Sequence, residues 1–243
     1  MLDIHPAHHA ASTWRDFFIH IITIVLGLLI AIGLEQTVEY IHHRHQREEL
    51  REALRQDADT NARDAFISYG WFTAYDNWTT NRIAQVHEAI RSHRPLAAPA
   101  LKPSGRPAPD QLEPAWNAAK SSGLMTVLPQ DEIKAYAEVD RLFGELERGI
   151  YAGAEAEEKM RSFESGFCEH TCDDKSFADA SVADLREYIR LLKATQLTLV
   201  WTTGDLRDIF NAETAILQGH HDLATLQQVE YQPMPSSLPQ TKP

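Results

Sequence analysis

The stretch FFIHIITIVLGLLIAIGL, residues 17–34, decides how this chain is built. Thirteen of its eighteen residues are Leu, Ile, Val or Phe, and none carries a fixed charge. At about 1.5 Å per residue it forms a helix roughly 27 Å long, close to the roughly 30 Å hydrocarbon core of a bilayer. We therefore predict a transmembrane anchor helix over residues 13–34, with the lipid bilayer as a partner.

The apolar run has the features of a retained anchor and not those of a cleaved signal peptide. A signal peptide has a shorter apolar core, a basic region before it and a small-x-small cleavage site after it. Here the preceding sixteen residues hold one Arg and two Asp, and the nearest such site, Ala31-Ile32-Gly33, lies inside the run. Residues 1–12 show no periodicity and are predicted to be a flexible tail.

Nearly all of the charge follows the anchor. The chain of 243 residues has a formal net charge of −12, and an acidic domain is repelled by phosphate backbones. This charge argues against nucleic acid as a partner. Glycine is scarce, while Ala, Glu, Leu and Arg are abundant, which favours helix. The expected fold class is all-α: the transmembrane helix continues into a long stalk helix, followed by an antiparallel helical bundle.

Apolar residues at steps of three and four predict the helices of a soluble bundle domain, residues 35–229. The first helix is expected to end near Ser68, because Gly70 follows it. The other predicted helices span 71–92, 115–121, a long run after Pro129, and 182–217. The last of these is capped by Ser181 and Asp184, which have capping-box spacing.

Two segments rich in proline interrupt the helical pattern. Residues 93–114 hold six of the twelve prolines and are predicted to be an extended loop, which at this length is either functional or disordered. Residues 230–243 hold four more and are predicted to be a disordered tail.

The two cysteines, Cys168 and Cys172, lie in the segment FCEHTCDD and allow three interpretations. A local disulfide would fix a loop between two long helices. Free thiols are expected in a reducing compartment. A metal site would use both cysteines with His170, but structural zinc needs four ligands, and only His220 and His221 are available to complete the set. The disulfide is favoured, and no metal or cofactor is predicted.

Two further groups of residues are candidate contact or binding sites. Thr23, Gly27 and Ala31 recur every four residues in the anchor, a small-residue stripe that lets two membrane helices approach and form a homodimer. The aromatic residues Trp71, Tyr75 and Trp78 are candidates for lining a ligand pocket, although aromatics at helical spacing usually form core.

No catalytic signature is present in the sequence. It contains no G-x-S-x-G, H-E-x-x-H, Walker loop or G-x-G-x-x-G motif. Acidic residues are plentiful, but their context singles out none of them. We therefore predict that the chain is not an enzyme.

The first of two distinctive segments is WRDFFIHIITIVLGLLIAIGLEQTVE with the charged helix HHRHQREELREALRQD after it. It resembles the N-terminus of a family of uncharacterised single-pass bacterial inner-membrane proteins, and a second segment is similar to the middle of their soluble domain. The second is AWNAAKSSGLMTVLPQDEIKAYAEVDRLF, with its tryptophan (Trp116), Ser-Gly turn (Ser122 and Gly123) and helical tyrosine (Tyr136). The resemblance covers about a third of the chain and implies a bacterial inner membrane and a helical soluble domain. It implies no catalytic residue.

Orientation and role follow from these features only in part. The Lys and Arg residues flanking the anchor place the large domain in the cytoplasm, but long domains cross the membrane largely regardless of such charges. The cysteine pair suits an oxidising compartment, and we therefore expect the soluble domain to lie in the periplasm. We predict an envelope scaffold that binds an unidentified protein partner. The alternative is a single-pass sensor with an aromatic pocket, which requires a cavity near Trp71, Tyr75 and Trp78.

Overall fold

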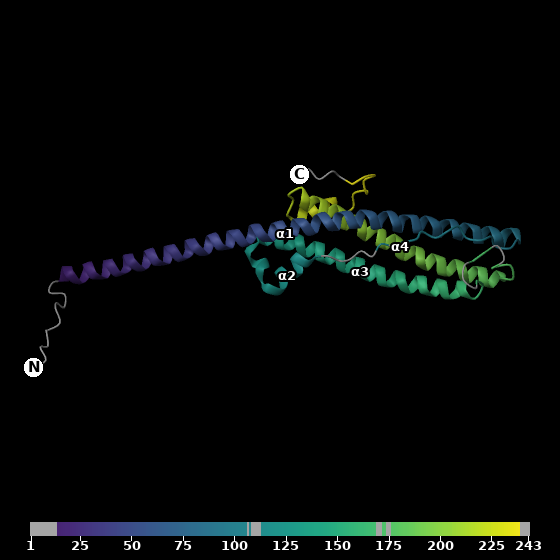
Figure 1. Ribbon diagram of the computed structural model, residues 1–243, viewed down its shortest axis with the longest axis horizontal. Coiled ribbons are helices and arrows are strands. Elements are labelled where there is room, and N and C mark those ends of the chain that lie inside the picture. Colours follow the sequence, from purple (N-terminus) through teal and green to yellow (C-terminus); the bar gives the residue numbers. More distant parts are fainter. Residues whose placement is uncertain (1–13, 106, 108–112, 169–171, 174–175, 239–243) are drawn as a thin grey trace, which may run out of the picture. The chain divides into compact units, whose positions relative to one another are not determined.

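The computed structural model describes residues 14–105, 107, 113–168, 172–173 and 176–238, and the described chain is all-α (Figure 1). The α-helices are α1 (Trp14–Ser92), α2 (Pro114–Ser122), α3 (Gln130–Ser165), α4 (Val182–Leu217) and α5 (Leu223–Val229). A short 3₁₀ helix, η1 (Leu124–Val127), connects α2 to α3. The described residues contain no strand.

The chain divides into two compact units, Met1–Glu49 and Leu50–Pro243, and α1 contributes to both. In the first unit, α1 contains a segment that is long and apolar enough to cross a membrane, with a mean hydropathy of 2.7 over eighteen residues. None of that segment is buried, which distinguishes it from the core helix of a soluble protein.

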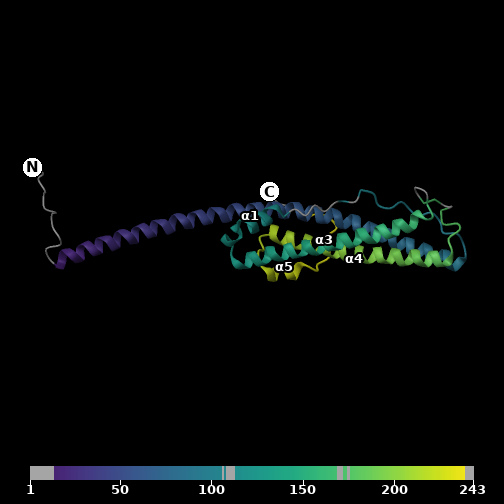
Figure 2. The ribbon, with the colours of Figure 1, turned by 90° about the horizontal axis from the view of Figure 1, so that it is seen from below.

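In the second unit, three long helices lie side by side, as both views show (Figure 1; Figure 2). Asn61 of α1 bonds Glu213 of α4, while Thr80, further along α1, bonds Gln196, earlier in α4. Helix α4 is therefore antiparallel to α1. Helix α3 is antiparallel to α4 as well, because Gly149 approaches Thr202 while Gly153 approaches Thr198. Helices α1 and α3 therefore run in parallel, with Arg51 of α1 bonded to Glu132 in the first turn of α3.

The parallel pairing of α1 and α3 explains the long proline-rich loop. The chain leaves α1 at Ser92 and must return to Asp57, whose carboxylate accepts a hydrogen bond from the N–H of Ala115 in α2. That return covers roughly 50 Å at about 1.5 Å per helical residue. A chain of about 22 residues at no more than about 3.3 Å each reaches about 73 Å, so it spans this distance in an open conformation and leaves no room for a helix of its own.

One predicted boundary is wrong: α1 continues through Gly70 to Ser92 where two helices were expected. A single exposed glycine in a helix costs about 1 kcal/mol relative to alanine. The buried side of α1 continues in step on either side of it, with Ala65 and Ser68 before the glycine and Phe72 and Tyr75 after it. Packing of this side offsets the cost, so the helix does not end.

The other helix ends agree closely with their predicted signals. Ser181 and Asp184 form a reciprocal capping box at the start of α4. Gly123 adopts a left-handed conformation, φ 75°, after α2. The predicted disordered tail is wrong for its first residues, because Asn211 donates hydrogen bonds to the carbonyls of Glu230 and Gln232 and the side chain of Glu230 is buried. Helix α5 was not predicted.

Candidate functional site

The aromatic residues of α1 hold the proline-rich loop and leave little free space. The indole N–H of Trp78 donates to the carbonyl of Ala100 at 2.7 Å, and that of Trp71 donates to the carbonyl of Ser104 at 3.1 Å. The guanidinium of Arg82 donates to the carbonyl of Ala97 at 2.7 Å. These three side chains fix residues 97–104, which we call the strap, along α1 by its main-chain carbonyls.

Only a small cavity remains beside Trp71 and Tyr75. It lies between α1, α3 and α4 and has a volume of about 10 Å³, which is room for about one water molecule. Pockets for small ligands are typically about 300–1,000 Å³. The hydroxyl of Tyr75 is buried here, near the carboxylate of Glu157. Burial, with the nearby charge of Glu157, raises the pKa of Tyr75.

A larger surface hollow of about 590 Å³ lies between α3 and α4, and four of its charged side chains form two ion pairs. Lys159 bonds Glu155 at 2.6 Å, and Arg190 bonds Glu187 at 2.6 Å, each within a turn of its own helix. Exposed pairs of this kind contribute about 0.3–0.5 kcal/mol each, and the hollow is an open surface depression and not an enclosed pocket.

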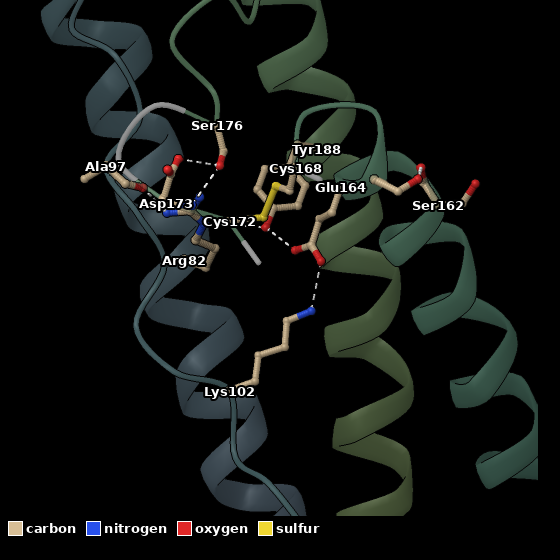
Figure 3. The surroundings of a disulfide bond; sticks show 11 residues. Arg82, Ala97, Lys102, Ser162, Glu164, Cys168, Cys172, Asp173, Ser176 and Tyr188 are labelled. Carbon is tan, nitrogen blue, oxygen red and sulfur yellow. Dashed lines mark hydrogen bonds and ion pairs between the residues drawn. A yellow bond between two sulfur atoms is a disulfide. The ribbon is translucent and has the colours of Figure 1, made fainter. Parts of the chain in front are cut away.

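The two cysteines form a disulfide, Cys168–Cys172, directly after α3 (Figure 3). No free cysteine is present, so neither sulfur is available as a metal ligand. No cluster of three or more His, Cys, Asp or Glu residues able to hold a metal occurs in the described part of the chain. His170 of the alternative metal set lies outside the described residues.

A buried polar network lies beside the disulfide (Figure 3). Tyr188, fully buried on α4, donates to the carboxylate of Glu164 at 2.6 Å, and Lys102 of the strap bonds the same carboxylate at 3.0 Å. The guanidinium of Arg82 is 1% exposed and lies over the rings of Tyr188 and Phe177, 5.6 and 5.5 Å from their centroids. Cation–π contact and the carbonyl of Ala97 compensate in part for burying this charge.

A second buried cluster lies where α2 docks onto the long helices, and the sequence analysis did not identify it. Glu213 is 3% exposed, and one of its carboxylate oxygens accepts a hydrogen bond from the amide of Asn61 at 2.9 Å. Burial raises the pKa of Glu213 to about 7. Burial, reinforced by the charges of Asp140 and Glu213, raises the pKa of Glu113 to about 8.

These two carboxyl groups lie apart from the cavity and the hollow described above. Neither Glu113 nor Glu213 lines the cavity beside Tyr75 or the hollow between α3 and α4. Both lie within the packing of α2, whose Trp116 is 3% exposed. Because their pKa values are raised, Glu113 and Glu213 bind protons more tightly in the folded protein than in the unfolded chain. The free energy of unfolding therefore depends on pH.

The small-residue stripe of the anchor is accessible. Thr23, Gly27 and Ala31 are all exposed, and a Cβ added at Gly27 would meet nothing within 4 Å. The hydroxyl of Thr23 donates to the carbonyl of Ile19 within its own helix. The stripe therefore presents a smooth surface with its polar group already satisfied, as close helix packing in a membrane requires.

No protein-family model, curated protein or solved structure matches this chain. The resemblance to uncharacterised inner-membrane proteins stays a prediction from the residues that carry it.

Proposed function

We propose that this chain is a membrane-anchored helical scaffold of the bacterial envelope that acts by binding other protein molecules. This choice rests on the observation that protein atoms fill the space around Trp71, Tyr75 and Trp78. Trp71 and Trp78 use their indole N–H groups on the chain's own strap, and the remaining cavity of about 10 Å³ is far below the size of a ligand pocket. A solid core at this position favours a scaffold over a ligand-binding sensor.

The disulfide supports a periplasmic location for the bundle. Disulfides persist in oxidising compartments, which include the bacterial periplasm, and are rare in the cytoplasm. The exposed apolar segment of α1 supports a retained anchor in the inner membrane, since nothing in the described chain covers it. The acidic composition, with a net charge of −12, keeps the bundle soluble and off anionic lipid.

Reporter fusions test the anchor and its orientation together. A phosphatase that is active only after export and a fluorescent protein that folds only in the cytoplasm are each fused at Ser236, an exposed residue near the C-terminus. We expect phosphatase activity without fluorescence, in a membrane fraction that resists carbonate. A fluorescent, phosphatase-inactive fusion would overturn the periplasmic assignment, and release by carbonate would overturn the anchor.

A further inference from the structure

The strap is held by its main-chain carbonyls and hardly at all by its side chains. Two indole N–H groups and one guanidinium on α1 donate to the carbonyls of residues 97, 100 and 104. None of residues 97–104 is buried, and the side chain of Leu101 is 97% exposed. The contact is therefore made to the backbone of an extended segment, and most of its side chains contribute nothing to it.

Backbone contacts of this kind are how proteins recognise proline-rich peptides. Such a peptide forms a polyproline II helix of about three residues per turn, without internal hydrogen bonds, and docks on aromatic side chains. The strap contains Pro99 and Pro103, and two of its bonded carbonyls, those of Ala97 and Ala100, are one such turn apart. The strap thus lies on α1 in the manner of a proline-rich ligand.

One side chain of the strap does make specific contacts. The ammonium group of Lys102 bonds the carboxylate of Glu164 at 3.0 Å, as Figure 3 shows, and lies 4.9 Å from the centroid of the Trp78 ring. An ammonium group at this distance is attracted by the negative face of the indole. The net charge of −12 adds a general attraction for cationic segments. The face under the strap therefore recognises carbonyl groups and one cation.

We propose that this face binds an extended, proline-rich, lysine-containing segment of another protein, and that the strap occupies it until such a segment displaces the strap. We call Trp71, Trp78 and Arg82 of α1, with Glu164 of α3, the strap-binding face. The inference names the kind of partner that the scaffold binds, and to that extent it rests on the proposed function. The strap itself indicates the class of ligand, because it is a seated occupant of known sequence.

The loop is long enough to release the strap while its two ends stay in place. Leu96, just before the strap, is 1% exposed, and beyond the loop the N–H of Ala115 bonds Asp57. The loop reaches about 73 Å when extended but has to cover only roughly 50 Å, so it has slack. A segment with few buried side chains opens locally at low cost. An incoming segment offers the same carbonyl groups, so the buried guanidinium of Arg82 keeps an acceptor.

Peptide binding to the full chain in detergent, measured by fluorescence anisotropy, tests the proposal. In the strap-replaced chain, residues 97–104 become an equally long Gly-Ser segment, which frees the strap-binding face. The labelled peptide keeps the four prolines and the lysine of residues 95–107 and has alanine at every other position. We expect it to bind the strap-replaced chain at least about tenfold more tightly than the parent, in which the strap competes.

Matched controls locate the bound peptide. In the strap-replaced chain, Trp78→Phe removes one indole donor and should weaken binding about fivefold. Trp201→Phe, the same change at a 56% exposed site on α4, should alter it less than about twofold. A peptide with glutamate in place of its lysine places a carboxylate against Glu164 and should lose at least about tenfold in affinity.

The outcomes separate this inference from the proposed function. No saturable binding to a strap-replaced chain that keeps its helical circular dichroism overturns the inference, as does equal affinity for the glutamate peptide. Binding of a peptide with the full strap sequence, but not of the alanine-substituted one, also overturns it, because the face then accepts only its own chain. If the strap-replaced chain does not fold, Lys102→Glu frees the same face by repulsion from Glu164. Anchor and orientation are tested by the carbonate and fusion experiments, and their failure leaves the peptide result unchanged.

Discussion

Replacing Glu213 by Gln should stabilise this protein at alkaline pH. The carboxyl group of Glu213 is buried on α4, and a single hydrogen bond from Asn61 supports it at 2.9 Å. Glutamine has almost the same shape, and its side-chain carbonyl can accept the same hydrogen bond. The substitution removes only the ability to become charged in the core.

The magnitude follows from the pKa of Glu213, which burial raises from 4.5 to about 7. Each pKa unit corresponds to about 1.4 kcal/mol, so the shift corresponds to about 3 kcal/mol. Between these two pKa values the folded state binds more protons at this site than the unfolded state does. The stabilising contribution is therefore fully present below pH 4.5 and is lost as the pH rises through about 7.

Urea unfolding of the full-length protein in detergent, followed by tryptophan fluorescence from pH 4.5 to pH 9, measures this effect. The free energies of unfolding of Glu213→Gln and the parent should agree near pH 4.5 and differ by about 3 kcal/mol at pH 9, with the variant more stable. The charge of Glu213 helps to raise the pKa of Glu113 to about 8, so this pKa is lower in the variant, and the change adds to the stability that the variant gains at pH 9.

Glu187→Gln is the matched control on the same helix. Its carboxylate is exposed and paired with Arg190, a partner that lowers the pKa of Glu187. This control should gain no stability at high pH. The reasoning about burial is refuted if the curves of Glu213→Gln and the parent run parallel from pH 4.5 to pH 9, or if Glu187→Gln gives the same gain.

Three further variants test the disulfide, the strap and the anchor. Cys168→Ser with Cys172→Ser opens a loop with a sequence separation of 4, and should lower the free energy of unfolding by about 2 kcal/mol, measured by urea titration without reductant. A parent whose thiols react fully without reductant would contradict the disulfide. Trp78→Phe removes the hydrogen bond from the indole to the strap and should cost about 1 kcal/mol in the same titration, whereas an unchanged midpoint would show that the strap is not held there. Gly27→Ile should weaken self-association in detergent, measured by light scattering, while Gly33→Ile, equally uncovered but off the small-residue stripe, should not.

The sequence predicts the ends of helices well where a local signal fixes them. The capping box of Ser181 and Asp184 and the left-handed Gly123 each act within a few residues, so their meaning does not depend on the rest of the fold. Gly70 is different, because the same residue ends one helix and is tolerated in another. Whether α1 continues depends on the packing of its buried side against α4, which no signal near Gly70 reports.

The candidate sites were harder to predict, since their contacts join distant parts of the chain. Trp71 bonds a carbonyl 33 residues away, and nothing near it indicates that partner. The burial of Glu213, in contrast, could be predicted from its sequence position. It falls within the buried helical pattern of Ile209, Ala212 and Ile216, so its position indicates burial even though its charge suggests solvent.

The exposed apolar face of α4 follows from how closely α3 approaches on the opposite side. A Cβ on Gly149 would lie 3.3 Å from the hydroxyl oxygen of Thr202, and one on Gly153 would lie 3.4 Å from that of Thr198. Only small side chains fit between helices this close. Turning α4 to bury Trp201 would place an indole where a threonine already fills the space, and overpacking of this kind costs about 1–3 kcal/mol or more. The packing of α3 against Thr198 and Thr202 therefore leaves Leu197, Val200 and Trp201 of α4 exposed in the folded bundle.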